Sequence, residues 1–241
     1  MTMSMEAVII IVRLIAYAAA GLTAGFSAVY VINHVPAKWF CDYDEEPTDE
    51  MWGKRIKEYP WNLIFSFFFI GALFLIWETE LIYQVAAVPA LWLLLLIGIS
   101  DKKFMIIPDQ FVIGIAIVSI GFVPYQSNIL SPLLGALMGG GSLLTIGLIA
   151  SRILKRDAMG FGDIKLMAAI GLMVGLKGIL IIMILTLLSS GGILGIMCFL
   201  GKVKRNEEQP LGPFIAAAAA GFILFRPWLL MAADWYVGLY S

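Results

Sequence analysis

Long apolar runs separated by short polar segments dominate the hydrophobic pattern of this chain. Each run is continuous rather than alternating with a period of two, which indicates helices rather than strands. A helix of about 20 apolar residues is long enough to cross the hydrocarbon core of a bilayer, which is roughly 30 Å thick. Spans are expected at residues 7–32, 61–77, 85–100, 111–123, 132–150, 163–174, 179–200 and from 211 onward. The sequence therefore predicts an all-α, polytopic integral membrane protein with about eight transmembrane helices.

Composition and charge strengthen this prediction. Hydrophobic residues make up 61% of the 241 residues and charged residues only 14%, whereas charged residues approach about 25% of a soluble domain. The net charge of −1 says little about partners, and no nucleic acid is expected as one. The two cysteines, Cys41 in a polar segment and Cys198 in an apolar run, give no sign of a disulfide framework. The first apolar run is too long for a cleavable signal, so none is expected.

The Lys and Arg residues predict the orientation of the chain, because cytoplasmic loops are enriched in them. With the N-terminus outside, 13 of the 16 Lys and Arg residues fall in cytoplasmic segments, and only Arg13, Lys177 and Arg226 stay outside. The sequence therefore predicts a multi-pass protein of the cell inner or cytoplasmic membrane with both termini outside. Residues 1–60 are expected to form the first span and a short cytoplasmic loop, and residues 61–241 the membrane-embedded core.

Two aspartates stand at the ends of apolar runs on the same predicted cytoplasmic face. Asp101 ends the third run and Asp163 opens the sixth. A carboxylate in hydrocarbon costs at least a few kcal/mol, so an acidic residue in such a place indicates a function, although Asp is also a common helix N-cap. Gly160 and Gly162 lack a Cβ, so another backbone, such as an extended substrate, can approach Asp163 closely. The shared face favours a functional interpretation over two separate helix caps.

Two carboxylates that meet at one membrane depth suit hydrolysis by an activated water. In a low-dielectric setting the pair shares one proton, and the two groups titrate in coupled steps. One carboxylate then takes a proton from water while the other donates to the scissile carbonyl. No catalytic set built on histidine competes, because His34 lies in a loop far from the small hydroxyl residues of the spans. The residues predict an aspartic protease with Asp101 and Asp163 as its catalytic pair.

These motifs resemble those of the type IV prepilin leader peptidases, a family of membrane aspartic proteases with a Gly-x-Gly-Asp motif. In that family the first catalytic aspartate lies seven residues before a proline that is followed by Asn or Asp. The residues that carry the match are Asp101, Pro108, Asp109, Gly160, Phe161, Gly162, Asp163 and Lys165, with shorter matches at Tyr59-Pro60 and Leu211-Gly212-Pro213-Phe214. The resemblance implies cleavage of a basic N-terminal leader from prepilin-like precursors, ahead of a hydrophobic helix, at the cytoplasmic face of the membrane. It implies no cofactor for the peptidase.

The chain departs from the family in its first cytoplasmic loop. Many bacterial members carry two Cys-x-x-Cys pairs there, a spacing suited to a tetrahedral metal, whereas residues 34–60 contain Cys41 alone. No metal site and no zinc are therefore expected. Weak or no N-methyltransferase activity is expected, so S-adenosylmethionine is a cofactor only if that activity is retained. Interfacial packing is expected to hold the loop instead, through Trp39, Phe40, Trp52 and Ile56.

Lys165 and Asp109 have simpler interpretations than a direct part in catalysis. Lys165 lies two positions after Asp163, so on a helix it points about 200° away from that residue. It is expected to be an interfacial cation whose long side chain reaches the polar surface. Asp109 follows Pro108, which interrupts the helix, and is expected to start the fourth span.

Two other classes of function stay open beside the leader peptidase. One is an intramembrane aspartic protease of the presenilin or signal-peptide-peptidase kind, which sets its first aspartate inside a span after a tyrosine. Asp101 instead follows Ser100 at a span end. The other is a transporter that uses the two acids as proton or cation ligands, which predicts polar residues along the spans, and few occur there. The leader peptidase is favoured, with the precursor and the lipid bilayer as partners.

Overall fold

The computed structural model of the chain describes residues 5–41, 45–155, 159–201 and 209–238. Within these ranges it contains only helices and connections, and no strand. The α-helices are α1 (Met5–His34), α2 (Trp61–Leu75), α3 (Leu81–Phe104), α4 (Asp109–Val118), α5 (Ser131–Leu154), α6 (Phe161–Phe199) and α7 (Gly212–Gly238). The 3-10 helices are η1 (Ala37–Phe40), η2 (Asp49–Met51) and η3 (Ser119–Tyr125). The predicted all-α class is confirmed.

Five of the described helices are long and apolar enough to cross a membrane, namely α1, α3, α5, α6 and α7. α2 and the stretch Asp109–Tyr125 are shorter apolar helices. The predicted count of about eight spans is therefore not confirmed. The five helices leave out α2 and Asp109–Tyr125, which fall short of a full span in length, and count α6 once, although it contains the expected sixth and seventh spans on either side of a break at Gly175.

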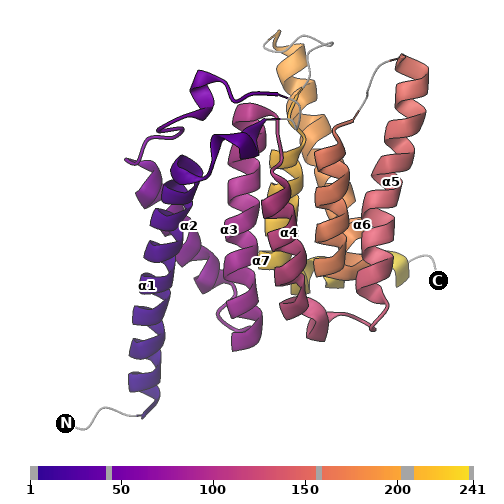
Figure 1. Ribbon diagram of the computed structural model, residues 1–241. Helices are drawn as coiled ribbons and strands as arrows, with labels where there is room; N and C mark the ends of the chain where they lie inside the picture. The colour runs from indigo at the N-terminus through magenta and orange to yellow at the C-terminus, as the bar shows by residue number, and fades with distance from the viewer. Residues whose placement is uncertain (1–4, 42–44, 156–158, 202–208, 239–241) are drawn as a thin grey trace.

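α6 changes direction at Gly175. This residue has φ 73° and ψ −176°, which no helix contains. The neighbouring helix shows the reversal, because Gly139 of α5 lies against Met167, before the break, and also against Ile179, after it. Both ends of α6 consequently lie on the upper side of the bundle in Figure 1. The boundary that the sequence predicts between the sixth and seventh spans, at residues 175–178, is the place of this break.

Polar side chains satisfy the backbone at this break. The Gln126 side-chain amide donates to Leu172 O over 2.8 Å, and the backbone N–H of Leu176 donates to Ser131 Oγ over 3.2 Å. A Cβ on Gly175 would overlap Ser131 Oγ, and its positive φ disfavours any side chain. Glycine and two polar partners thus let the chain reverse while Leu172 O and the Leu176 N–H stay paired in an apolar environment.

The helices pack around α3 on one side and α6 on the other. α3 contacts α1, α4 and α7, and its Leu94 and Ile97 are almost fully buried. α5 packs along both halves of α6 through small residues. The two helices come close at Gly139, because a Cβ there would lie only 2.5 Å from Met167 O. This packing fixes the position of the beginning of α6, where Asp163 lies.

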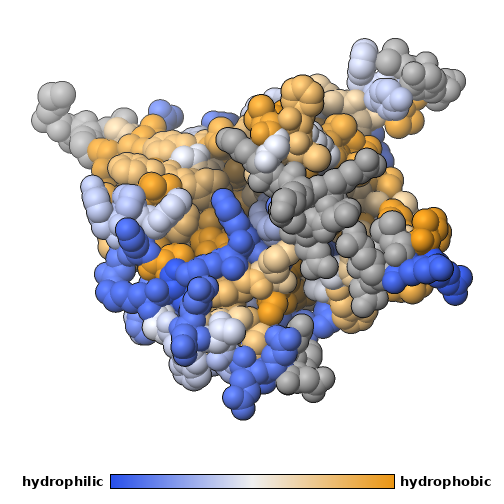
Figure 2. Space-filling model, turned by 90° about the horizontal axis from the view of Figure 1, so that it is seen from above, coloured by the Kyte–Doolittle hydropathy of each residue, from blue (hydrophilic) through white to orange (hydrophobic). Residues whose placement is uncertain are grey.

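One face of the bundle gathers the segments that the sequence predicts to be cytoplasmic. The connection between α1 and α2, the C-terminal end of α3 and both ends of α6 lie on the upper side of Figure 1, opposite the N-terminal end of α1. Figure 2 looks down on this upper face, where hydrophilic residues gather over the side on which the α1–α2 connection lies. Apolar residues border them, as expected for a face at the edge of a bilayer.

Candidate active site

A cavity of about 930 Å³ opens on this upper face. It lies between the C-terminal end of α3, the beginnings of α4 and α6, and the second half of α5. Every residue that the sequence analysis selected for the site lines it: Asp101, Pro108, Asp109, Gly160, Phe161, Gly162, Asp163 and Lys165. The structure thus brings together two motifs that are some sixty residues apart in the sequence.

Asp101 lies in the last turn of α3 and is 5% exposed. Its Oδ2 accepts a hydrogen bond of 2.8 Å from the backbone N–H of Gly212, the first residue of α7. The first N–H groups of a helix have no partner within the helix, so a carboxylate is a suitable acceptor for one of them. The beginning of α7 therefore holds the Asp101 carboxyl group in a fixed orientation.

Gly212 has to be glycine for this contact to form. A Cβ at position 212 would lie 2.7 Å from Asp101 Oδ2 and 2.9 Å from its Cγ, closer than packed side chains come. From the sequence, residues 211–214 are known only as a match to a family motif at the start of the last span. The structure gives one residue of that motif a physical role, which is to let the N-terminus of α7 approach Asp101.

Asp163 lies in the first turn of α6, as the sequence predicts, with Gly160 as the N-cap residue. Its backbone N–H donates to Gly160 O over 3.2 Å. Its Oδ1 is buried and has no hydrogen-bond partner among the residues that the structure describes. The cavity therefore holds one carboxyl group with a fixed hydrogen bond and one with a free acceptor atom.

The glycines before Asp163 let two chain segments approach each other. A Cβ on Gly162 would lie 3.1 Å from Ile107 Cβ, in the segment that joins α3 to α4. The sequence predicts that a substrate backbone approaches Asp163 closely at these glycines. At Gly162, however, the segment that lies close is Ile107 of the chain itself. Gly160 is more open, since a Cβ there would meet only Asp163 Oδ2 at 3.4 Å. Phe161, between them, is 64% exposed and lines the cavity.

The end of α3 is shaped so that Ile107 and Pro108 turn back over α6. Met105 closes the helix in the left-handed region, with φ 56°, and its N–H donates to Asp101 O over 2.8 Å. Ser100 Oγ donates to Ile106 O over 2.7 Å. Such a left-handed residue after a helix is a common C-terminal cap, usually glycine. These bonds fix the short segment between the two motifs.

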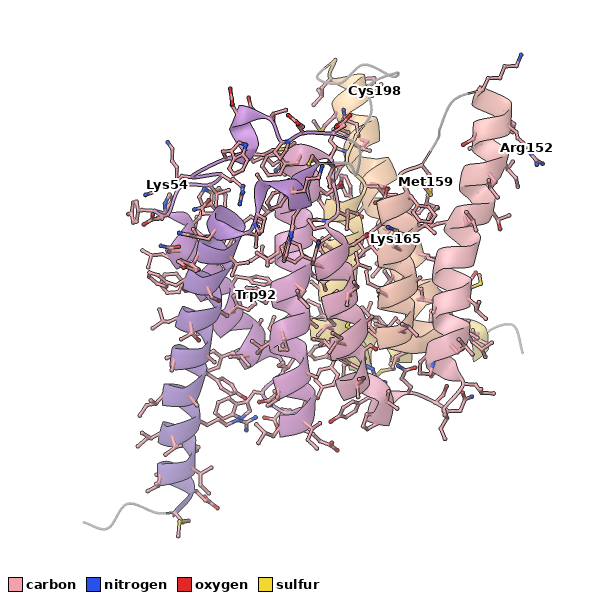
Figure 3. All side chains as sticks on the ribbon, viewed as in Figure 1. Lys54, Trp92, Arg152, Met159, Lys165 and Cys198 are labelled. Atoms are coloured by element: carbon pink, nitrogen blue, oxygen red, sulfur yellow. The ribbon has the colours of Figure 1, made fainter. Side chains whose placement is uncertain are left out.

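Lys165 and Asp109 form an ion pair across the cavity. Lys165 Nζ lies 2.8 Å from Asp109 Oδ1 and 2.9 Å from Oδ2, and 5.0 Å from the centre of the Phe161 ring. Figure 3 shows Lys165 on the first half of α6, below Met159. The two side chains are about one third exposed. Asp109 does begin α4, as predicted, but Lys165 is paired rather than reaching freely to the interface.

The side chains that the sequence predicts to hold the loop between α1 and α2 differ in how they pack. Phe40 is fully buried and packs on Phe104, with ring centres 4.9 Å apart, and Trp39 and Ile56 pack partly against the core. Trp52 is 63% exposed, so its packing at the membrane interface stays a prediction. Arg55 was predicted only to be one of the cytoplasmic charges. Arg55 is buried and bonded to three backbone carbonyl groups.

No cluster of three or more His, Cys, Asp or Glu side chains that could hold a metal occurs among the described residues. Cys41 and Cys198 are both free thiols, the first buried and the second exposed. Asp42 and Asp44, two acids of the α1–α2 loop, lie outside the described residues.

Comparison with known proteins adds an independent observation. Residues 87–200, which contain both aspartates, match the model of the type IV leader peptidase family. A prepilin leader peptidase/N-methyltransferase of Xanthomonas campestris is 35% identical over 130 residues, which cover 52% of this chain and 44% of that protein. Proteins of the same name from Bacillus subtilis and Pseudomonas aeruginosa are 32% and 29% identical over 140 and 150 residues. These alignments cover 55% and 59% of this chain and 52% and 50% of those proteins.

The chain spans about half the length of these curated relatives. No solved structure matches it.

Proposed function

We propose that the chain is a membrane aspartic endopeptidase that cleaves the N-terminal leader from type IV prepilin-like precursors, because residues 87–200 match the model of the type IV leader peptidase family. The proposal names Asp101 and Asp163 as the catalytic residues. It places the reaction at the cytoplasmic face of the cell inner membrane.

One observation carries the proposal: Asp101 and Asp163 come from helices far apart in the chain and line the same cavity. Gly212 holds one carboxyl group by a hydrogen bond, while Asp163 Oδ1 has no partner among the described residues. Burying an unpaired polar atom costs about 1–3 kcal/mol, so this oxygen is stabilised by any partner that the reaction brings to it. In the proposed reaction the nucleophile is a water held between the two carboxyl groups.

The proposed chemistry needs one ionised and one protonated carboxyl group. The ionised group takes a proton from the water as the water oxygen bonds to the scissile carbonyl carbon, and the other group gives its proton to the carbonyl oxygen. The C–N bond then breaks as the leaving nitrogen takes up a proton. The products are a leader with a new carboxyl end and a mature chain with a new amine.

The walls of the cavity support a precursor with a basic leader followed by an apolar helix. Leu144 and Leu148 of α5 and Phe161 of α6 give the cavity an apolar side. Four exposed acids lie in the α1–α2 loop, and they favour a basic segment at the same face. They are Glu45, Glu46, Asp49 and Glu50. The names of the relatives point to prepilin as substrate.

Methyl transfer is a separate question, because the relatives are named N-methyltransferases as well as leader peptidases. The chain contains two cysteines and one histidine, with Cys41 alone in the α1–α2 loop, and this donor set does not fit a tetrahedral four-thiolate zinc site. We therefore propose no structural zinc and weak or no transfer of a methyl group from S-adenosylmethionine. A metal assay of the purified protein and mass spectrometry of the processed product, with S-adenosylmethionine present, check both statements. One zinc per chain, or a fully N-methylated product, contradicts them.

The proposed function is tested with the purified chain in liposomes of bacterial lipid. A panel of prepilin-like precursors and, separately, a signal peptide without a basic leader are added, and the products are sequenced from their N-termini. We expect cleavage of a precursor at the junction of its leader and its apolar helix. Cleavage of the signal peptide within its apolar segment, with all precursors intact, contradicts the proposal and supports an intramembrane protease of the signal-peptide-peptidase kind.

A further inference from the structure

Residues 36–41 form one wall of the cavity described above. Pro36, Lys38, Trp39 and Cys41 all line it. This cavity wall has little regular structure of its own, since it contains only the four-residue helix η1. Short segments of this kind open easily unless other residues hold them. The position of the wall relative to Asp101 therefore depends on contacts from elsewhere in the chain.

Arg55 supplies such contacts from both sides of the wall. Its Nη2 donates to Val35 O over 2.8 Å, just before the wall, and its Nε donates to Met51 O over 2.7 Å, beyond it. Its guanidinium group also lies over the ring of Phe40, with Cζ 4.6 Å from the ring centre. The planar fork of arginine reaches acceptors in several directions at once, which a lysine ammonium group does not do in a fixed geometry.

The same side chain ties the wall to α1. Arg55 Nη1 donates to Ile32 O over 2.6 Å, one of the carbonyl groups in the last turn of α1. These carbonyls lack a partner within the helix and carry partial negative charge, so a cation is favoured there. Asn33 completes the join, because its Oδ1 accepts from the N–H groups of Arg55 and Ile56 over 2.8 and 2.9 Å.

A further contact connects Arg55 to α3, the helix that carries Asp101. Lys103 Nζ in the last turn of α3 donates to Arg55 O. Arg55 thus stands where the end of α1, the cavity wall and the end of α3 meet.

Burying the charged Arg55 side chain costs free energy unless these contacts offset it. The residue is 6% exposed, and no carboxylate among the described residues forms an ion pair with it. Burial lowers the pKa of its guanidinium group from its ordinary value, but arginine stays charged at neutral pH. Three backbone carbonyls and one aromatic face therefore stabilise a charge without a counter-ion, and this arrangement exists only when the wall is in place.

We propose that Arg55 is a positioning residue that holds the cavity wall, residues 36–41, against the ends of α1 and α3, and so shapes the site in which the precursor binds. The effect on substrate binding rests on the function proposed above, whereas the effect on the wall does not. Arg55 touches neither aspartate, so its loss weakens binding of the precursor more than it slows the chemical step.

The two cysteines provide a direct measurement of the wall. Cys41 belongs to it and is buried, whereas Cys198 is exposed at the far end of α6 and serves as an internal reference (Figure 3). The rates at which a maleimide labels the two thiols are measured in the full chain and in Arg55→Met, Arg55→Lys and Asn33→Ala. Lys54→Met is the matched control, because the Lys54 side chain is 77% exposed and bonds only Glu58 in the described residues.

In Arg55→Met we expect labelling of Cys41 to become about tenfold faster, as for a segment that opens locally, while Cys198 reacts at its original rate. The Cys41 labelling rate of Arg55→Lys should be close to that of Arg55→Met. The rate of Asn33→Ala should lie between these two variants and the original chain, and the rate of Lys54→Met should equal that of the original chain. An unchanged Cys41 rate in Arg55→Met overturns the proposal. Should Arg55→Met fail to fold, as judged by its thermal unfolding in detergent, Asn33→Ala decides: an unchanged Cys41 rate in this milder variant also overturns the proposal.

Cleavage assays of the same variants test the link to the site. For Arg55→Met we expect KM for a precursor to rise severalfold with kcat little changed, which a general loss of stability does not produce. A fast-reacting Cys41 with unchanged KM overturns the link to binding. If the original chain cleaves no precursor, the proposed function fails, but the labelling rates still decide whether Arg55 holds the wall.

Discussion

At the scale of single residues, the site depends on one backbone N–H. Gly212 donates to Asp101 Oδ2, and a Cβ at that position would lie 2.7 Å from the accepting oxygen. Asp101 is buried, so it has little room to move away. The identity of residue 212 therefore controls where the carboxyl group of Asp101 points.

We predict that Gly212→Ala lowers the rate of leader cleavage by about 100-fold, because an error of about 1 Å in the position of a catalytic group has effects of that size. The control is Gly221→Ala in the same helix, since nothing lies within 4 Å of a Cβ there. This control should cleave at the original rate. Equal rates for Gly212→Ala and Gly221→Ala would show that the contact between Gly212 and Asp101 does not matter for the reaction.

The ion pair of Lys165 and Asp109 lies in the same cavity but is expected to matter less. Both side chains are about one third exposed, so water screens the pair, and such pairs contribute roughly 0–1 kcal/mol. We predict that Asp109→Asn and Lys165→Met each keep most of the activity and that a double-mutant cycle of stability gives a coupling below about 1 kcal/mol. Loss of all cleavage in Asp109→Asn would instead place Asp109 among the catalytic residues.

At this scale the sequence predicted the residues that chemistry singles out. Acids at the ends of apolar runs are costly, so Asp101 and Asp163 were conspicuous, and the structure brings both into one cavity. Arg55 and Gly212 were not predicted to lie at the site. An arginine in a polar loop looks like any other cytoplasmic charge until the fold buries it, and a glycine motif does not reveal which atom approaches it.

At the scale of elements, Gly175 divides α6 into two halves that run in opposite directions. The positive φ and the contact with Ser131 leave no room for a side chain. The second half of α6 depends on this turn to pack along α5, as the contact between Gly139 and Ile179 shows. The turn therefore also supports the first half, whose beginning carries Asp163.

We predict that Gly175→Ala destabilises the folded protein by about 2–4 kcal/mol, from the left-handed backbone together with the overlap at Ser131. Gly191→Ala, in the second half of the same helix, is the control, because a Cβ there meets nothing within 4 Å. Thermal unfolding in detergent should show a clear fall in Tm for the first variant and none for the second. A similar Tm for both would contradict the account of the turn.

The sequence predicted the positions of the apolar helices well, but not which of them are long enough to cross the membrane. Hydrophobic runs mark where a helix lies, and the predicted boundary at residues 175–178 coincides with the break in α6. Length decides whether a helix crosses a bilayer by itself, and α2 with its 15 residues falls short. Whether a short apolar helix spans the membrane depends on its neighbours, which a hydropathy pattern does not contain.

At the scale of the whole molecule, the distribution of Lys and Arg predicts that the cavity faces the cytoplasm. Cys198 lies at the upper end of α6, on the side of the molecule where the cavity opens (Figure 3), and is exposed. We predict that a membrane-impermeant maleimide labels Cys198 in inverted membrane vesicles and not in intact spheroplasts. Labelling in spheroplasts alone would reverse the orientation and with it the proposed face of cleavage.

The central claim is that the two carboxyl groups in one cavity perform the cleavage together. The most direct measurement is cleavage of a precursor by the chain in liposomes, with Asp101→Asn, Asp163→Asn and the control Asp234→Asn compared side by side. Asp234 pairs with Lys177 over 2.9 Å at a well-exposed site and does not line the cavity. We predict no product from either cavity variant and full activity from the control. Substantial cleavage by Asp101→Asn or by Asp163→Asn, in a folded protein, would contradict the claim.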